Sequence, residues 1–334
     1  MRKSLVLLGL SFSLYLTACE AVVAAAAGPP HVMIVLMENH SYEEVIGNPQ
    51  MPSINALAAA NAVVSTTDLS HPSEPNYLGL VSGSIQDNPQ DVTPQDKTYA
   101  GPQLTDELAA AGVGWKAYME NMPIACDLTD RYSPEGYDVN HNPFMYFDSV
   151  RHNPGQCSRD VPYTQLTADL TAGSAPPFMW VSPNTTHDMH DRTDAQGDVF
   201  IKSLVTQVQA SSWWTANSRL IVTWDEGTKS EQIATIVVGA PYASRADGGS
   251  EYGTLRGLEE AYGVGLLGHS ADPNVGDILP LLSGSTSPPA GGMAPLWVGA
   301  EALEAATDEP TDLVGEPSFP FEPPRDARTP FPYA

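Results

Sequence analysis

Four short segments with continuous apolar cores constrain the fold of this chain more than any other feature. They are HVMIVLM at 31–37, FMWVSP at 178–183, RLIVTWDE at 219–226 and IATIVVGA at 233–240. Strands that are apolar along their length are buried on both faces, as in a parallel sheet covered by helices. Helical patterns at 105–112 and 198–214 lie between these segments. The sequence therefore predicts an α/β fold, with a central, mostly parallel sheet flanked by helices on both faces.

The N-terminus has the pattern of an export signal. Arg2 and Lys3 precede an apolar run, and LTAC then places Cys19 where a lipoprotein signal peptide is cleaved and the new N-terminal cysteine is lipidated. The alternative is a transmembrane anchor, but a span needs about 20 apolar residues. We expect residues 1–19 to be a lipoprotein signal peptide. The mature protein would be exported, on the periplasmic or extracellular face, and would meet the membrane only through its lipid anchor.

The rest of the chain divides into three parts by composition. Residues 20–30 read as a short tether, and residues 31–285 as one globular domain, for which a 42% hydrophobic content is ample. Residues 286–334 are rich in Pro, Gly, Ser and acidic residues and cannot bury enough apolar surface to offset their chain entropy. We expect this tail to be disordered or loosely docked, and the protein to be a monomer.

The charge balance limits the possible partners. The chain has 15 Lys and Arg against 40 Asp and Glu, a formal net charge of −25. This field repels polyanions and argues against a nucleic-acid partner. A local site for a phosphate group would need a metal ion or local dipoles to overcome it.

Two cysteines remain after Cys19, namely Cys126 and Cys157. An even pair in an oxidising compartment predicts a disulfide between them. Two free, buried thiols are the alternative.

Polar clusters follow several of the predicted strands. In open α/β sheets ligands collect at the carboxyl ends of the strands. The clusters are Glu38 and Asn39; the segment from His71 to Asn76, which contains Ser73; Asn184, His187, Asp188, His190 and Asp191; and Asp225 with Glu226. Carboxylates, an amide oxygen and imidazoles that converge on one edge would form a site for a divalent cation.

Each cluster also has a structural interpretation. Glu38 and Asn39 could cap the helix that begins in SYEEVIG, and Ser73 could be an N-cap, although that position also suits phosphate oxygens. His187 and His190 are three residues apart, a spacing that puts both on one face of a helical turn, and most such pairs bind no metal. Asp225 and Glu226 could form a solvated turn.

Several motifs occur together in a characteristic order: ENHSY, HPSEPNYLGLVSG, HNPF, PNTTHDMHD and LIVTWDEG, followed by YGTLRGLEEAYG. From about residue 31 to about residue 277 the chain resembles the phosphoesterase family of bacterial secreted acid phosphatases and phospholipases C. The resemblance implies an alkaline phosphatase-like fold and hydrolysis of phosphate esters through a covalent phosphoenzyme.

The resemblance also implies a role for each motif residue. Ser73 would be the nucleophile, with Glu38, Asn39, Asp225 and Glu226 as ligands of a divalent metal. His71, His141, His187 and His190 would surround the phosphoryl group, and Asp191 would orient one of them. Phosphoryl transfer needs positioning and charge neutralisation, a covalent intermediate, and an acid for the leaving group. That acid would be His190 or His187, which favours acidic to neutral pH.

One position departs from the family pattern. Glu251 stands where the family usually has a histidine, just before the LRG-x-E segment. A carboxylate there would either add a metal ligand or weaken phosphate binding. His269 could supply an imidazole from nearby, or be an ordinary loop histidine.

These features predict a metal-dependent hydrolase of small phosphate esters, with phosphomonoesters as the expected substrates, of the acid phosphatase type. A phospholipase C-type phosphodiesterase is the first alternative, but such members are longer, with added C-terminal domains. A non-catalytic, lipid-anchored surface binding protein is the second; Glu251 favours it, and the nucleophile candidate Ser73 argues against it.

Overall fold

The computed structural model describes residues 28–283, except residues 89, 131, 132, 134, 135, 242–245 and 247. The predicted signal peptide with Cys19, most of the tether and the predicted tail from residue 286 lie outside the described residues. Over the ranges that are described, no helix combines the length and the apolar character needed to cross a bilayer.

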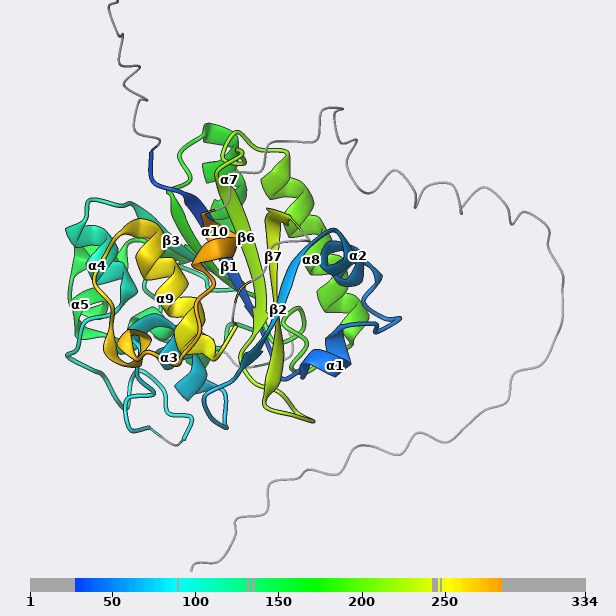
Figure 1. Ribbon diagram of the computed structural model, residues 1–334. Coiled ribbons are helices and arrows are strands. Elements are labelled where there is room, and N and C mark those ends of the chain that lie inside the picture. Colours follow the sequence, from blue (N-terminus) through cyan, green and yellow to red (C-terminus); the bar gives the residue numbers. More distant parts are fainter. Residues whose placement is uncertain are drawn as a thin grey trace, which may run out of the picture. The chain divides into compact units, whose positions relative to one another are not determined.

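Seven strands form one mixed sheet in the order β2-β7-β6-β1-β5-β3-β4 (Figure 1). β1 lies at its centre and runs parallel to β5 and β6, and β3 runs parallel to β5 and β4. β7 is antiparallel to both β6 and β2. The strands are β1 (His31–Met37), β2 (Asn61–Thr67), β3 (Trp115–Met119), β4 (Asp160–Pro162), β5 (Phe178–Ser182), β6 (Ser218–Trp224) and β7 (Gln232–Pro241). The predicted mostly parallel sheet is confirmed.

Three of these strands were not predicted from the sequence. β2 is an edge strand whose residues alternate between buried and more exposed positions, so it lacks a continuous apolar run. β4 has only three residues. β3 has a lysine in its second position, Lys116. A search for continuous apolar segments misses strands that alternate between buried and exposed residues, that are very short or that contain a charged residue.

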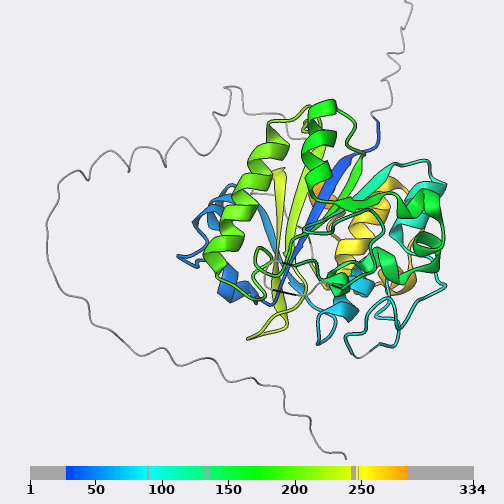
Figure 2. The same ribbon diagram turned by 180° about the vertical axis from the view of Figure 1, so that it is seen from behind.

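Alternate residues of β1 face two separate helical layers, because side chains along a strand point to opposite faces. Val32, Ile34 and Leu36 pack with α3 (Glu74–Ser82), α4 (Leu104–Ala110), α9 (Glu251–Tyr262) and α10 (Leu279–Leu282). Met33, Val35 and Met37 pack with α2 (Pro52–Ala60), α7 (Thr164–Ala172) and α8 (Asp194–Gln209). Figure 1 shows the first layer in front of the sheet, and Figure 2 shows α7 and α8 in front of the other face.

The helix expected at 198–214 is shifted towards the N-terminus. α8 begins at Asp194 because Thr193 and Gln196 form a capping box there. It ends at Gln209, before Trp213 and Trp214. The remaining short helices are α1 (Tyr42–Val45), α5 (Asp148–Arg151) and α6 (Pro154–Cys157), with 3-10 turns at Val139–His141, Pro143–Tyr146 and Gly268–Ala271.

Cys126 and Cys157 form a disulfide with an S–S distance of 2.12 Å. It joins the loop after β3 to α6. The predicted pairing is confirmed.

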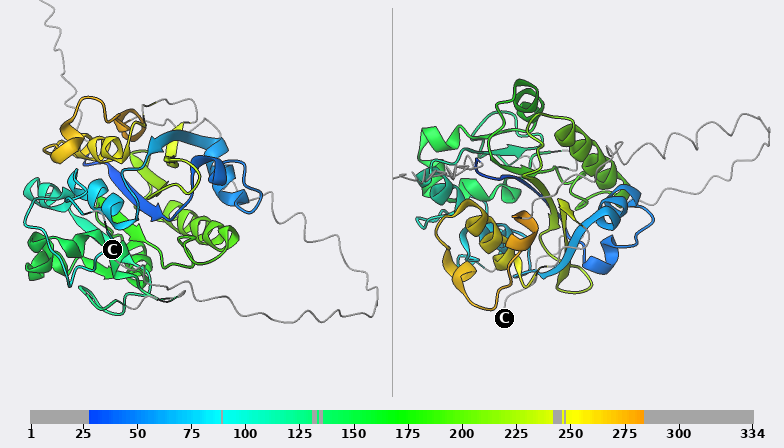
Figure 3. Two further views of the ribbon diagram at one scale, coloured as in Figure 1. Left: turned by 90° about the horizontal axis from the view of Figure 1, so that it is seen from below. Right: turned by 45° about the horizontal axis from the view of Figure 1, so that its top comes forward.

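The carboxyl ends of β1 and β6 lie side by side, because Met37 pairs with Trp224 in the parallel register. The backbone N–H of Asp225 donates to the Met37 carbonyl at 3.0 Å. This register brings Glu38 and Asp225, the residues that follow the two strands, next to each other. Figure 3 (left) views the molecule from this edge of the sheet, with α3 in cyan and α9 in yellow beside β1.

Candidate active site

Glu38 lies at the centre of the polar groups at this edge and is fully buried. Its Oε2 accepts hydrogen bonds from Ser73 Oγ and Asn39 Nδ2, each at 3.1 Å. Its Oε1 accepts one from the Tyr77 hydroxyl at 2.5 Å and lies 3.3 Å from Nε2 of His141. Burial raises the pKa of Glu38 to about 8, although the neighbouring His141 acts in the opposite direction.

Asn39 reaches the second carboxylate through its backbone. It has a φ of 55°, in the left-handed region that asparagine tolerates better than most residues. Its N–H donates to Asp225 Oδ1 at 3.0 Å. The helix-capping role that Glu38 and Asn39 might have had falls to Ser41, which caps α1 and whose N–H donates to Glu44.

Ser73 immediately precedes α3, and its hydroxyl makes no capping bond to that helix. Asp91 satisfies the helix end instead, since its Oδ1 accepts from the Glu74 N–H at 3.0 Å. The Ser73 hydroxyl is therefore directed to Glu38. The N-terminus of α3, with its partial positive charge, lies at the same point, which suits an approaching anion.

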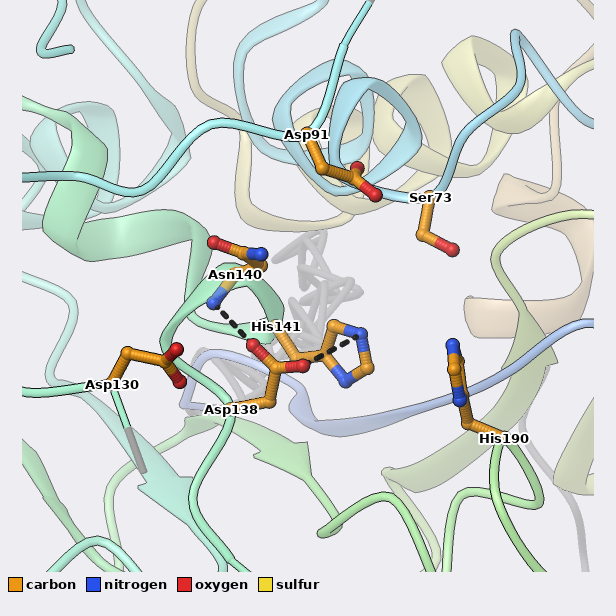
Figure 4. A pocket seen from close by; sticks show the side chains of 7 residues that line it. All are labelled: Ser73, Asp91, Asp130, Asp138, Asn140, His141 and His190. Atoms are coloured by element: carbon orange, nitrogen blue, oxygen red, sulfur yellow. Dashed lines mark hydrogen bonds and ion pairs between the residues drawn. The ribbon is translucent and has the colours of Figure 1, made fainter. Parts of the chain in front are cut away.

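A pocket of about 300 Å³ opens in front of Ser73. It is lined by Ser73, Asp91, Asp130, Asp138, Asn140, His141 and His190 (Figure 4). His190 projects into it from the opposite side to Asn140, on the same side as Ser73. Its ring Nδ1 lies 2.8 Å from Asp191 Oδ1, and its backbone N–H donates to Asp188 Oδ1 at 2.8 Å. The structure thus pairs Asp191 with His190, which is the contact expected of a residue that orients the imidazole.

His141 lies beneath the pocket between two carboxylates. Its Nε2 faces Glu38, and its Nδ1 lies 3.3 Å from Asp188 Oδ2. Its ring stacks on Tyr77 with centroids 5.1 Å apart. Burial alone would lower the pKa of His141, but the charges of Glu38 and Asp138 hold it well above the ordinary value.

The other two predicted histidines lie outside the lining of this pocket. His187 Nδ1 lies 2.9 Å from Glu120 Oε1, and its ring stacks on Phe200 at 5.2 Å. The segment that carries His187 and His190 is not a helical turn, because Met189 has a φ of 83° and redirects the backbone between them. Their spacing of three therefore does not place them on one face.

His71 is half-exposed and belongs to a neighbouring acidic group. Its Nδ1 lies 3.0 Å from Glu226 Oε2, and its Nε2 lies 3.4 Å from Glu231 Oε2. Glu226 is therefore paired with His71, whereas Asn39 and Ser73 lie with Glu38. Burial and the charge of Asp225 raise the pKa of Glu226 to about 8.

The donor set fits a divalent cation. None of the seven residues that line the pocket is a lysine or arginine. Glu38, His141 and Asp188 each offer a ligand atom, all within 4.8 Å of one another. Asp225 is fully buried, and its Oδ2 accepts no hydrogen bond from the described residues. Burial and the charge of Glu38 raise the pKa of Asp225 well above its ordinary value. Buried carboxylates in this number call for a counter-charge.

Sequence reasoning did not assign roles to four residues near the site. Asp188 lies within the HDMHD motif, so its position was visible, but a motif does not show which of its members points inwards. Asp138 stands three residues before His141, while Asp91 and Asn140 carry no comparable signal.

Comparison with known proteins identifies the family. The model of the family described as the Phosphoesterase family matches residues 48–248. A phosphatidylinositol-3-phosphatase of Mycobacterium tuberculosis is 34% identical over 266 residues, which cover 77% of this chain and 85% of that protein. An acid phosphatase of Aspergillus fumigatus is 26% identical and covers 70% of this chain, and a probable acid phosphatase of Kluyveromyces lactis is 25% identical and covers 74%.

The chain spans 55% and 61% of the lengths of these two fungal relatives. Among solved structures, a protein in the alkaline phosphatase superfamily from Vibrio parahaemolyticus is 13% identical, with 74% of this chain and 71% of that chain covered and a TM-score of 0.46. The family match and the mycobacterial relative together show that this chain belongs to the phosphoesterase family and is a phosphoric ester hydrolase.

Proposed function

We propose that the protein is a metal-dependent phosphomonoesterase that works through a covalent phosphoserine on Ser73. The observation that carries this proposal is the 3.1 Å hydrogen bond from Ser73 Oγ to Glu38 Oε2 at the pocket wall. It gives a serine at a helix N-terminus a proton acceptor beneath an open pocket, and this is the arrangement that an activated nucleophile requires.

The first step forms the phosphoserine. Ser73 Oγ attacks the phosphorus as the bond to the ester oxygen breaks, and the hydroxyl proton passes to Glu38 Oε2, which already accepts its hydrogen bond. His190, held by Asp191, gives a proton to the departing oxygen, so the alcohol leaves neutral.

The second step releases phosphate. A water molecule attacks the phosphorus and gives a proton to His190, the bond from phosphorus to Ser73 Oγ breaks, and Glu38 returns its proton to that oxygen. The products are inorganic phosphate and an enzyme in its starting protonation state. His71 and His187 take no part in this scheme, because their contacts are with Glu226 and Glu120.

Glu38, Asn39 and Asp225 would hold the cation, with His141 and Asp188 beside them. When bound, a divalent cation there would favour the ionised Ser73 hydroxyl and offset the charge of the phosphoryl group. The chain itself supplies no lysine or arginine to the pocket lining for that purpose.

The names of the relatives favour phosphomonoesters over phosphodiesters as the substrate class. One is a phosphatidylinositol-3-phosphatase and others are acid phosphatases. A phosphorylated inositol lipid headgroup and small soluble monoesters are therefore the substrates to test first. A phospholipase C-type activity on diesters remains the alternative outcome of the same test.

The proposed location is the outer face of a membrane. The disulfide between Cys126 and Cys157 fits an oxidising compartment. Lipidation at Cys19, the tether, the domain over residues 31–285 and the disordered tail remain proposals from the sequence. Incorporation of a labelled fatty acid into wild type, and its loss in Cys19→Ser, would test the anchor.

The decisive experiment measures product release from a substrate panel by the purified protein: phosphate from the monoesters, p-nitrophenol from the nitrophenyl esters and phosphocholine from phosphatidylcholine. The panel contains p-nitrophenyl phosphate, a phosphoinositide monoester, phosphatidylcholine and bis-p-nitrophenyl phosphate. We expect monoester turnover that a chelator abolishes and a divalent cation restores, and a labelled phosphoserine that Ser73→Ala lacks. Full activity in Ser73→Ala would remove the proposed nucleophile, whereas turnover confined to the diesters would favour the phospholipase C-type alternative.

A further inference from the structure

Glu251 is a buried carboxylate that has no hydrogen-bond partner among the described residues. The residue is only 1% exposed, and neither Oε1 nor Oε2 has a hydrogen-bond partner among the described residues. A buried polar group normally finds a partner, and a buried carboxylate that lacks one is strongly unfavourable. Protonation would not resolve this, because a neutral carboxyl group would still leave a donor and an acceptor unpaired. Something other than the described residues must satisfy it.

The backbone holds Glu251 firmly at the carboxyl edge of the sheet. Glu251 is the first residue of α9, after Ser250, which bridges Thr67 at the end of β2. Gly249 has a φ of +54°, and a Cβ there would lie 2.0 Å from the Val275 carbonyl oxygen. A Cβ at Gly253 would lie 2.3 Å from the same atom. Close backbone packing on both sides therefore fixes the start of α9.

The start of α9 lies close to the strand end that carries Asp68, because the Thr67 N–H donates to the Gly249 carbonyl at 2.8 Å. Asp68 in turn accepts from the N–H of Gly227, two residues after Asp225, at 2.8 Å. Burial raises the pKa of Glu251 well above its ordinary value, and the charges of Asp225, Asp68 and Glu226 raise it further. The packing of α3 against α9 brings the helix that follows Ser73 and the helix that begins at Glu251 together. Glu251 therefore begins its helix beside Asp68 and the loop that follows Asp225.

Each neighbouring acid has at least one protein partner, although Asp68 Oδ1 and Glu226 Oε2 accept no hydrogen bond from the described residues. Glu251 has no hydrogen-bond partner at either oxygen among those residues. Glu226 is paired with His71, and Asp68 Oδ2 accepts from the Gly227 N–H at 2.8 Å. Asp225 Oδ1 accepts from the Asn39 N–H. The oxygens that accept no hydrogen bond from the described residues include both of Glu251 and Oδ2 of Asp225. These are the oxygens available to a cation.

We propose that Glu251 is a ligand of the divalent cation bound at Asp225, and that it tunes the site towards hard cations. This rests on the proposed function, because the cation is the one invoked there. Oxygen donors suit Ca²⁺, Mg²⁺ and Mn²⁺, whereas imidazole nitrogen suits Zn²⁺. An additional carboxylate therefore raises the affinity for the hard cations relative to Zn²⁺.

Calorimetric titration of metal-free protein with CaCl₂, MnCl₂ and ZnCl₂ tests the proposal. We expect Glu251→Gln to weaken Ca²⁺ and Mn²⁺ binding by about tenfold or more, since removal even of an outer partner of a ligand costs about 10–100-fold. Glu251→His should weaken Ca²⁺ binding while it retains Zn²⁺ binding, which lowers the ratio of Ca²⁺ to Zn²⁺ affinity by about tenfold or more. Unchanged Ca²⁺ and Mn²⁺ affinity in Glu251→Gln would overturn the proposal.

Glu259 provides a matched control on the same helix. It is also fully buried, but its oxygens accept hydrogen bonds from the Leu267 N–H at 2.8 Å and from Ser270 Oγ at 2.6 Å. Glu259→Gln should leave the affinity for all three cations unchanged while it lowers the melting temperature. An equal loss of Ca²⁺ affinity in this variant would show that the effect at Glu251 is only one of helix stability.

Thermal melting separates a ligand from a structural carboxylate. Without a cation, Glu251→Gln should melt at a higher temperature than wild type, because wild type must either bury a charge or take up a proton to fold, and glutamine does neither. With saturating Ca²⁺ its melting temperature should rise less than that of wild type. A purely structural glutamate would give a lower melting temperature in both states, and that result would count against the proposal.

Two further measurements cover the remaining outcomes. If Glu251→Gln does not fold, a crystal structure of the wild type soaked in CaCl₂ decides: a Glu251 oxygen about 2.3–2.6 Å from Ca²⁺ supports the proposal, and a clearly longer separation contradicts it. Turnover of p-nitrophenyl phosphate is measured in parallel. Cation binding without turnover by wild type would remove the proposed function alone, whereas turnover with unaltered affinity in Glu251→Gln would remove only the role of Glu251.

Discussion

The Tyr77 hydroxyl donates a 2.5 Å hydrogen bond to Glu38 Oε1, on the carboxylate whose other oxygen accepts from Ser73. Tyr77 is fully buried on α3, four residues after the nucleophile candidate, and its ring also stacks on His141. One helix therefore supplies both the serine and a residue that orients its proton acceptor.

Tyr77→Phe should lower kcat, although the substitution changes the side chain by only one hydroxyl group. The change keeps the ring but removes a donor to the ionised form of Glu38, so the pKa of Glu38 rises and the carboxylate forms only at higher pH. We expect kcat to fall by about tenfold, one pKa unit of effect, and the rising limb of the pH profile to move upwards. The free energy of unfolding should drop by about 1–3 kcal/mol, because a buried acceptor loses a donor.

Tyr118→Phe is the matched control for that variant. Tyr118 is fully buried in β3, and its hydroxyl donates to Asp169 Oδ2 at 2.9 Å. It should lose a similar free energy of unfolding and keep its pH profile. A shifted profile in both variants would mean that loss of stability, and not the contact with Glu38, changes the rate.

His190→Ala should affect substrates according to their leaving groups. An alkyl phosphate releases a strongly basic oxygen that needs a proton, whereas p-nitrophenolate leaves readily without one. We expect turnover of an alkyl phosphate to fall by about 10²–10⁴-fold and that of p-nitrophenyl phosphate much less. Steady-state rates on the two substrates provide the test.

Two other histidines make this prediction specific. His152 is 65% exposed in its side chain and pairs with Asp148, so His152→Ala should leave both rates unchanged. A large selective loss on the alkyl phosphate in His187→Ala, with His190→Ala unaffected, would assign the acid to His187 despite its contacts with Glu120 and Phe200.

Asp191→Asn should reproduce a milder form of the His190 defect, because it removes the carboxylate at Nδ1.

The cation-free protein should become less stable as the pH rises from about 5 to about 8. Burial raises the pKa of Glu38 and Glu226 from 4.5 to about 8, and that of Asp68 from 3.8 to about 7. Between these values the folded state holds more protons than the unfolded state. The contribution to stability is therefore complete below the unfolded pKa values and is lost as the pH rises through the folded ones.

Melting temperatures of chelator-treated protein across this pH range check the sign. Saturating Ca²⁺ should flatten the decline, because a cation replaces the protons as the counter-charge. Glu226→Gln should make the slope shallower than in wild type. A melting temperature that increases from acidic to slightly alkaline pH in the cation-free protein would contradict this account of the acidic cluster.

Removal of the disulfide should destabilise the domain without disturbing the chemistry. Cys126 and Cys157 are 31 residues apart in the sequence, a loop whose closure contributes about 3.7 kcal/mol in the chain-entropy model. We expect the double variant Cys126→Ser, Cys157→Ser to lose up to about that much in urea unfolding. At urea concentrations below the unfolding transition, the kcat of the variant should match that of wild type. Reduced wild type is the control. If reduction lowers the urea midpoint of wild type less than the two substitutions do, the serines themselves introduce strain.

The sequence alone was sufficient for the layers of the fold and for part of the site. Continuous apolar runs found β1, β5, β6 and β7, and the polar residues that follow β1 and β6 include Glu38 and Asp225. Both signals are local and follow directly from burial along a strand. The Cys126–Cys157 disulfide was predicted from the cysteine count and is confirmed. The role of Ser73 stays a prediction from its motif, and the structure shows its contact with Glu38. β2, β3 and β4 were missed, since alternating exposure, a lysine and a length of three residues respectively removed the continuous apolar signal.

The tertiary structure alone decided which polar side chains meet. His187 and His190 separate because Met189 adopts a left-handed conformation, and Glu226 pairs with His71 from a distant loop. Asp188 meets Glu38 and His141, although the three come from segments far apart in the chain. The sequence by itself determines which residues have reactive or ligating side chains and which strand ends they follow, because hydrophobicity and the spacing of apolar residues are local properties. Side-chain direction in loops depends on backbone conformation and on packing between distant segments, and only the folded chain determines these.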